Sequence, residues 1–258
     1  MMHAACLTDK GLVRKQNEDA VFANGASGLF AVADGMGGHG MGDVASKMCL
    51  DTLKQTLEGI EPPPPVPVET AQDNDMTLQE APDPMSDAVR DAVEQANTEI
   101  YSLNASRGAS KGSGMGATLA GFKVFDNLSR AVVFHVGDSR VYRLRGGVLV
   151  RLTRDHSVYE EWKREGGNGK APFRNFILRA VGPNPSANPE LSVQAVLQGD
   201  IWLACSDGLT GMVQDDDIER ILRQARPDTL QEAAQALVDR AKERGGKDNI
   251  GVVLAART

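Results

Sequence analysis

Three apolar stretches of this chain end in an aspartate that is followed at once by glycine or serine. These pairs are Asp34-Gly35, Asp138-Ser139 and Asp207-Gly208; Asp248 precedes a fourth apolar stretch, and Asn17-Glu18-Asp19 opens a fifth. An uncompensated carboxylate near a protein core is costly, and oxygen ligands suit Mg²⁺ or Mn²⁺. The pattern therefore predicts a metal site at the ends of buried strands.

A single Asp-Gly pair is typical of a turn, because aspartate caps its own backbone and glycine tolerates positive φ. We therefore expect these pairs to form turns that aim the carboxylates. Arg14 lies four residues before Glu18. Beside a cation cluster it is a candidate phosphate clamp, since the guanidinium fork matches two phosphate oxygens.

The composition excludes several classes of protein. A net charge of −7 argues against a nucleic-acid binder, which needs a basic face, and no apolar stretch approaches the length of a membrane helix. Three scattered cysteines without a CxxC pair do not form a disulfide framework, which favours a reducing compartment. We expect a cytoplasmic protein with neither nucleic-acid nor membrane partners.

Apolar periodicity predicts both helices and strands. Helical spacing covers Gly42–Leu57 and a second stripe from Val89 to Leu103, and further helices are expected after Asp215 and from Thr229, where Thr229 and Glu232 match a capping box. Gly245 is the expected C-cap of the last helix. The strands are expected at His3–Thr8, Ala20–Ala23, Leu29–Ala33, Leu119–Phe125, Ala131–Val136, Val141–Leu144, Val148–Leu152, Leu191–Leu197, Ile201–Cys205 and Ile250–Ala255.

This order of elements predicts an α+β fold with two antiparallel sheets covered by helices. Two segments stand apart from it. Glu61–Met85 is rich in proline and acids, which predicts a solvated connection between two helices. Val158–Asn175 is polar and glycine-rich, which predicts a mobile surface excursion. No internal repeat or domain boundary is visible, so we expect a single domain over residues 1–258.

The glycine-rich stretch Gly35–Gly40 also matches the G-x-G-x-x-G pattern of dinucleotide-binding loops. A nucleotide-binding oxidoreductase is therefore an alternative, which NAD binding by the purified chain would support. We prefer a different interpretation, because Asp34 would abut the pyrophosphate and the neighbouring strands are joined by tight turns. The glycines would then let the backbone turn sharply or approach a metal.

With these residues laid out, the chain resembles the bacterial form of the PP2C-like (PPM) family of metal-dependent serine/threonine protein phosphatases. Eight motifs match in order along nearly the whole chain: Arg14–Asp19, Ala33–His39, Gly114–Thr118, Val136–Arg140, Leu152–Ser157, Arg179–Gly182, Ser206–Leu209 and Asp248–Ile250. The resemblance implies a four-layer αββα sandwich, in which two central antiparallel sheets are flanked by helix pairs and a two-metal site lies at one end.

The resemblance also assigns ligands. It implies that Asp34 and the carbonyl of Gly35 bind both metals, that Asp19 serves the same shell, and that Glu18 acts through water. The cofactors would be two Mn²⁺ or Mg²⁺ ions.

The remaining roles concern the first metal, a third metal and the substrate. Asp207 and Asp248 would complete the first metal, Asp138 with Asp207 would hold a third and weaker one, and Arg14 would bind the substrate phosphate. A hydroxide bridging the two metals would then attack phosphorus in line. The implied partners are phosphorylated proteins, substrates of a cognate serine/threonine kinase, acted on by a monomer.

The chain departs from the family pattern at two places. Met36 occupies the position where animal members place a histidine that is a candidate general acid, so a metal-bound water would protonate the leaving oxygen. Val158–Asn175 corresponds to a short flap beside the cleft, and relatives often carry His-Pro where this chain has Ala171–Asn175. The alternative to an active enzyme is a pseudophosphatase that binds phosphoproteins as a regulator, which is expected to have lost a ligand.

Overall fold

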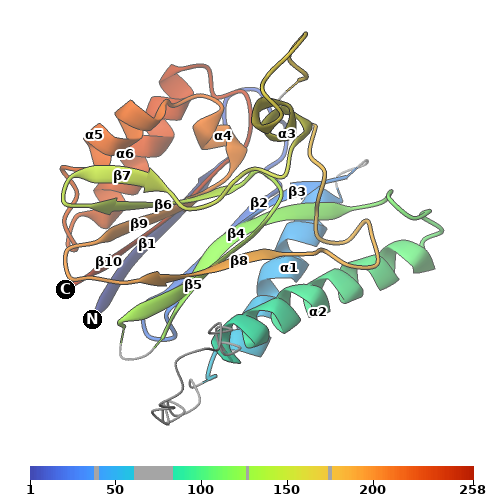
Figure 1. Ribbon diagram of the computed structural model, residues 1–258, viewed down its shortest axis with the longest axis horizontal. Helices are drawn as coiled ribbons and strands as arrows, with labels where there is room; N and C mark the ends of the chain where they lie inside the picture. Colours follow the sequence, from blue (N-terminus) through green and yellow to red (C-terminus); the bar gives the residue numbers. More distant parts are fainter. Residues whose placement is uncertain (38–40, 61–83, 126–127, 174–175) are drawn as a thin grey trace, which may run out of the picture.

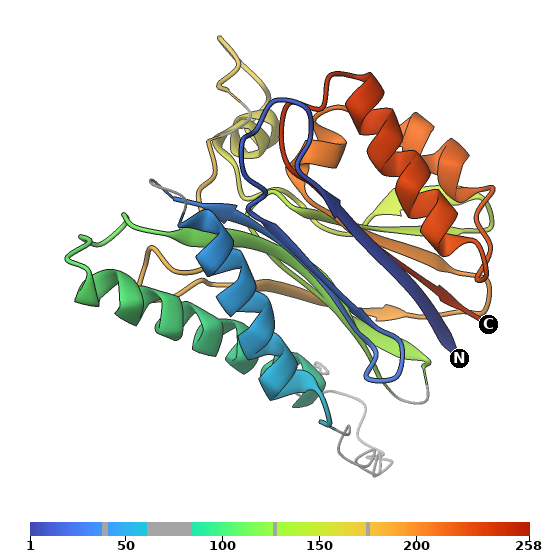
Figure 2. The ribbon, with the colours of Figure 1, turned by 180° about the vertical axis from the view of Figure 1, so that it is seen from behind.

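The computed structural model describes residues 1–37, 41–60, 84–125, 128–173 and 176–258. Two five-stranded antiparallel sheets lie face to face, and helices cover the outer face of each (Figure 1). The four-layer αββα sandwich expected from the sequence is therefore confirmed. The N- and C-termini lie close together, because the first residues of β1 pair with the last residues of β10 (Figure 2).

The first sheet has the strand order β2-β3-β4-β5-β8 and is covered by two helices. Apolar side chains at helical spacing on α1 and α2 pack on its outer face and form one buried cluster with it. The elements are β2 (Asp19–Asn24), β3 (Leu29–Met36), β4 (Gly116–Phe125), β5 (Arg130–Val136), β8 (Glu190–Ala195), α1 (Gly42–Leu57) and α2 (Pro84–Ser106).

The second sheet has the order β1-β10-β9-β6-β7. Its outer face packs against α4, α5 and α6, and a second buried cluster lies between them. The elements are β1 (Met2–Asp9), β6 (Arg140–Arg145), β7 (Val148–Arg151), β9 (Ile201–Cys205), β10 (Ile250–Arg257), α4 (Asp207–Thr210), α5 (Asp215–Leu222) and α6 (Leu230–Glu243).

A third apolar cluster holds the two sheets together. Phe30 and Phe122 of the first sheet stack with ring centroids 4.8 Å apart, and Phe122 lies 5.1 Å from Trp202 of the second sheet. All three side chains are fully buried. Buried aromatic pairs of this kind stabilise a fold beyond the free energy of their area burial.

Most of the expected elements are confirmed, α1 and β9 with their predicted bounds. The excursion from residue 158 is not loop throughout, because it begins with the helix α3 (Val158–Arg164). Ser157 caps this helix by accepting a hydrogen bond from the backbone of Glu160, and acids in the first turn with bases in the last turn suit the helix dipole. No side chain of α3 is buried. Of the connection predicted at Glu61–Met85, residues 61–83 lie outside the described residues.

The capping box predicted at the start of α6 is wrong. Thr229 does occupy the N-cap position, but its side chain makes no cap hydrogen bond to the helix. Its hydroxyl instead accepts from the backbone N–H of Arg226, which closes the preceding turn. Gly245, expected as the C-cap, follows the C-cap Arg244 at a φ of 122°.

Candidate metal centre

The predicted carboxylates meet at one end of the sandwich, between the two sheets. Asp19 and Asp34 come from the first sheet, where they are directly paired across β2 and β3. Asp207 follows β9 and Asp248 precedes β10, and these two strands belong to the second sheet. A hollow of about 390 Å³ opens there, lined by Arg14, Glu18, Asp34, Gly35, Met36, Gly37, Thr118, Asp138, Ile177, Asp207, Asp248 and Asn249.

The Asp34-Gly35 pair does not form the turn that the sequence suggested. Both residues belong to β3 and pair with Thr118 and Ala117 of β4. Glycine is required here for a different reason: a Cβ on Gly35 would lie 2.0 Å from the carbonyl oxygen of Gly42. Because Gly35 has no side chain, β3 can pass close to the start of α1. In this position of β3, the Asp34 carboxylate lies in the gap between the sheets.

Asp207-Gly208 is not a simple turn either, because Asp207 begins the short helix α4. A Cβ on Gly208 would lie 1.8 Å from the carbonyl oxygen of Asn249, so this close approach also needs glycine. Asp207 and Asp248 are thereby held side by side. Asp138-Ser139, in contrast, lies between β5 and β6, after Gly137 at a φ of 102°.

The carboxylates lack enough positive charge around them. Among the described residues, Asp19 Oδ1 and Asp207 Oδ1 are buried oxygens without a hydrogen-bond partner. Burial, followed by the charges of Asp207 and Asp248, raises the pKa of Asp19 to about 7. The pKa of Asp34 is raised well above its usual value by burial and then by Asp19 and Asp207. Burial and Asp248 also raise the pKa of Asp207.

This arrangement fits divalent cations. Unpaired buried carboxylates are unfavourable unless a cation compensates them, and a set of oxygen donors is what Mg²⁺ and Mn²⁺ prefer. Six of the seven residues predicted as ligands line the hollow, and Asp19, the exception, is paired with Asp34 across β2 and β3. The side chains are thus placed as the prediction requires, whereas the division of ligands between individual cations stays a prediction.

Asp138 occupies a different position from the other carboxylates. Together with Asp207 it lines both the hollow above and a second one of about 440 Å³ on the side of α3 and α5. Burial and the charge of Asp207 raise the pKa of Asp138 to about 7. The role of Asp138 and Asp207 in a third, weaker metal site stays a prediction.

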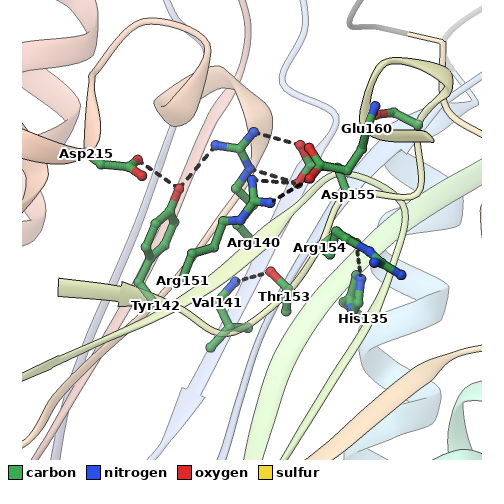
Figure 3. A network of polar contacts seen from close by, with 11 residues as sticks. His135, Arg140, Val141, Tyr142, Arg151, Thr153, Arg154, Asp155, Glu160 and Asp215 are labelled. Carbon is green, nitrogen blue, oxygen red and sulfur yellow. Dashed lines mark hydrogen bonds and ion pairs between the residues drawn. The ribbon is translucent and has the colours of Figure 1, made fainter. Parts of the chain in front are cut away.

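A network of polar contacts fixes the chain beside Asp138 (Figure 3). Arg140 binds both oxygens of Asp155, at 2.9 and 2.7 Å, and donates to the hydroxyl of Tyr142. Arg151 contacts Asp155 and, at 3.4 Å, Glu160 of α3. The side chains of these ion pairs are only partly buried. They attach the base of the flap to the strand that follows Asp138.

Arg14 reaches into the hollow from the β1–β2 loop. Its Nη2 lies 2.6 Å from Asp248 Oδ2, and half of the side chain is exposed to solvent. The loop is held by Asn249, whose Nδ2 donates to the carbonyl oxygens of Lys10 and Gln16 while its Oδ1 accepts from the backbone of Glu18. Asn249 is buried, so these three bonds are shielded from water.

Asn249 and Ser206 lie in two of the eight matching motifs, but their residue types and spacing predict no role for them. Ser206 donates to Asp19 Oδ2 at 2.7 Å and accepts from the backbone N–H of Gly251, so it orients a carboxylate of the opposite sheet. A polar residue next to a predicted ligand was a usable signal. The partner could not be read from it, because Ser206 and Asp19 are 187 residues apart.

The raised pKa values predict how the metal-free protein responds to pH. Asp19 and Asp138 titrate near 7 in the folded chain and near 4 when unfolded. The folded state therefore binds more protons across this interval, so stability falls as pH rises through it. In chelator, we expect Tm to drop by roughly 5 °C or more between pH 5 and pH 8, as measured by scanning calorimetry. Mn²⁺ should raise Tm more at pH 8 than at pH 5, and a Tm that rises with pH in chelator would contradict this.

Comparison with known proteins agrees with this geometry. The sequence model of the family described as protein phosphatase 2C matches residues 13–243. The chain belongs to the protein phosphatase 2C family. It is 36% identical to the serine/threonine phosphatase stp of Listeria monocytogenes, over 99% of this chain and 96% of that protein.

Solved phosphatase structures of the family share the fold. The crystal structure of the Mycobacterium tuberculosis serine/threonine phosphatase PstP/Ppp is similar with a TM-score of 0.83 and 31% identity, covering 99% of this chain and 98% of that one. The catalytic domain of PstP in complex with two manganese ions gives a TM-score of 0.81 and 30% identity, over 99% and 97% of the chains. In this phosphatase 2C chain, β3 pairs antiparallel with β2 and β4, so the described strands around Gly35 do not form the βαβ unit of a dinucleotide-binding loop.

Proposed function

We propose that this phosphatase 2C chain hydrolyses phosphoserine and phosphothreonine in proteins, with Mn²⁺ or Mg²⁺ as its cofactor. The observation that carries the proposal is the convergence of Asp19, Asp34, Asp207 and Asp248 around one open hollow, with a guanidinium at its edge. Membership of the family and the two manganese ions of the related PstP structure support it.

The carboxylates are the proposed metal ligands. Asp34, the carbonyl of Gly35, Asp207 and Asp248 would hold two cations, with Asp19 and Glu18 completing the shell. Two bound cations supply an activated water nucleophile and neutralise the charge on a phosphate. Strand pairing fixes Asp19 and Asp34, and the close approach of Gly208 to Asn249 positions Asp207 beside Asp248.

Arg14 is placed to bind the substrate phosphate. Its guanidinium is exposed at the rim of the hollow, and its bond to Asp248 orients it toward the carboxylates. The fork of the guanidinium can hold two phosphate oxygens and stabilise the charge that spreads over them during transfer. Binding the phosphate at this edge directs the phosphorus atom to the base of the hollow.

The leaving oxygen must gain a proton without help from a histidine at position 36, which is methionine. Among the described residues that line the hollow, there is no histidine. The carboxylates there are committed to cations, so the proton is best supplied by water in the open hollow. Because a cleft of this kind admits solvent, a dedicated side-chain acid is not required.

A pseudophosphatase is not supported. None of the predicted ligands is missing, and the named relatives are phosphatases. We further propose that the chain acts as one domain and as a monomer on proteins phosphorylated by a cognate serine/threonine kinase in the cytoplasm. No helix among the described residues is long and apolar enough to cross a membrane.

The test is hydrolysis of a phosphothreonine peptide by the purified chain, followed by phosphate release. We expect turnover with Mn²⁺ or Mg²⁺ and its loss in chelator, restored when the metal is returned. Wild-type protein that binds Mn²⁺ in calorimetry yet releases no phosphate from phosphothreonine or phosphoserine peptides would contradict the proposal. Binding of such a peptide without turnover would instead favour the regulatory role.

A further inference from the structure

A buried histidine outside the metal centre holds the chain beside Asp138. His156 is 8% exposed and lines neither of the two hollows that contain Asp138. Its backbone N–H donates to the carbonyl oxygen of Gly137 at 2.8 Å, and the N–H of Gly137 donates in return to Nδ1 of the imidazole ring at 3.2 Å. Gly137 immediately precedes Asp138, so this reciprocal pair of bonds fixes the backbone one residue before a candidate ligand.

The bond from Gly137 determines where the ring of His156 carries its proton. Because Nδ1 accepts a hydrogen bond, it cannot hold a proton, and in the neutral ring the proton lies on Nε2. Nε2 is 3.3 Å from a carboxylate oxygen of Glu190, which can accept from it. Burial, followed by the charge of the neighbouring His135, lowers the pKa of His156 to about 4, so the ring is neutral at pH 7.

The orientation of this ring is fixed by a second histidine. The rings of His156 and His135 stack with centroids 4.4 Å apart and 24° between their planes. His135 is buried, and its Nε2 donates to the carbonyl oxygen of Arg154 at 2.7 Å. The stack therefore keeps Nδ1 of His156 aimed at the backbone of Gly137.

The same cluster has the residue types of a metal site, but its hydrogen bonds do not fit one. One donor atom each of His135, His156 and Glu190 lies within 4.8 Å of the others. A cation would need the lone pair of His156 Nε2, which carries the proton while Nδ1 accepts from Gly137. The guanidinium of Arg179 also lies 3.4 Å from that nitrogen and would repel a cation. The cluster is better explained as a support for Gly137.

The chain on the other side of Asp138 is also held. The hydroxyl of Ser139 is 2.6 Å from that of Thr118 on β4. Arg140 binds both carboxylate oxygens of Asp155, which immediately precedes the buried histidine. Two adjacent residues thus hold the turn before and after Asp138, and the direction of its carboxylate depends on both attachments.

We propose that His156 is a positioning residue for Asp138. Its neutral ring holds the backbone of Gly137, and this contact directs the Asp138 carboxylate into the region that the two hollows share. The inference rests on the proposed function, because it takes Asp138 as a metal ligand. Residues that orient a ligand without touching the metal commonly change metal affinity by about 10–100-fold. Loss of the contact should weaken the cation site to which Asp138 contributes and leave the other ligands in place.

The test uses two amide substitutions that both remove the imidazole ring. In His156→Asn, the side-chain oxygen takes the place of Nδ1 and can still accept from Gly137. In His156→Gln, the amide lies one methylene farther out and offers no acceptor there. Both variants lose the stacking on His135, so a difference between them reports the bond to Gly137. In metal-free protein, we expect the Gly137 amide to exchange its hydrogen at least about tenfold faster in His156→Gln than in wild type or His156→Asn.

Calorimetric titration with Mn²⁺ measures the effect on the metal centre. We expect the weakest binding step to be about tenfold weaker in His156→Gln than in wild type and nearly unchanged in His156→Asn. In an Asp138→Asn background, His156→Gln should cause no further loss of Mn²⁺ affinity, because the ligand that it positions has been removed.

Nitrogen NMR of the wild type gives a test that needs no variant: a proton on Nδ1 of His156 at pH 7 would overturn the inference. Equal Mn²⁺ binding in wild type and His156→Gln, equal losses in the two amide variants, or a further loss in the Asp138→Asn background would also overturn it. A weakest step that Asp138→Asn leaves unchanged would remove Asp138 from the ligands, and the inference with it. Wild type that binds Mn²⁺ but hydrolyses no phosphopeptide would instead overturn the proposed function.

Discussion

The Asp207→Asn variant should lose phosphatase activity by at least ~10³-fold in kcat/KM, since cation stabilisation of transition-state charge contributes several kcal/mol. Asp207, like Asp138, lines both hollows, and its Oδ1 has no hydrogen-bond partner among the described residues. Phosphate release from a phosphothreonine peptide measures the effect. Full activity in the variant would exclude Asp207 as a metal ligand.

A second readout separates loss of metal from loss of fold. Removing the charge of Asp207 relieves its repulsion with Asp248, so the metal-free variant should be at least as stable as metal-free wild type at pH 8. Mn²⁺ should raise Tm strongly in wild type and little in the variant. Asp216→Asn is the matched control: Asp216 is an exposed carboxylate that lines only the second of these two hollows, and we expect near-normal activity.

The second large effect is expected at Asn249. In Asn249→Asp, an oxygen would replace the Nδ2 that now donates to the carbonyls of Lys10 and Gln16, each 2.9 Å away. Repulsion would free the loop that carries Arg14, and each group left unpaired costs about 1–3 kcal/mol. We expect KM for phosphopeptide to rise by ~10-fold or more, with a smaller change in kcat, measured by steady-state kinetics.

A double-mutant cycle decides whether Asn249 acts through Arg14. Once Arg14→Ala has removed the clamp, Asn249→Asp should add little further loss in kcat/KM, because the two effects share one cause. Additive losses would mean that Asn249 only supports the fold. Asn24→Ala is a suitable control, since Asn24 also makes three hydrogen bonds but at the opposite end of β2, in the turn toward Ala26.

The periodicity and order of the elements predicted two antiparallel sheets covered by helices, and the family resemblance added the four-layer arrangement. The apolar stripes of α1 and α6 and the buried run of β9 have patterns that few other structures satisfy, and so their positions could be taken from the chain itself. A metal site could also be predicted, because aspartates beside buried strands are unfavourable without cations, whereas the ligand assignments came from the family resemblance and stay predictions. In each case the signal was local: apolar spacing indicates which face of a helix or strand is buried, and carboxylates beside buried strands indicate a bound cation.

What the sequence could not provide depends on contacts between distant residues. Asp34-Gly35 has the signature of a turn, yet strand pairing with β4 keeps it extended, and tertiary pairing overrides a two-residue preference. Thr229 had a local partner that a capping pattern does not reveal. Asn249 and Glu18 are 231 residues apart, so their bond has no trace in spacing along the chain.

The carboxylates of the metal centre are divided between the two sheets, and this has a mechanical meaning. At the middle of the sandwich, Phe30, Phe122 and Trp202 set the separation of the sheets by contact of apolar surfaces. At the metal end, like charges push the sheets apart, and Ser206 with Asp19 is one bond between them. A cation held by carboxylates of both sheets would join the sheets at this end, so we expect the cohesion of the metal end to depend on ionic conditions, whereas the apolar contacts in the middle do not.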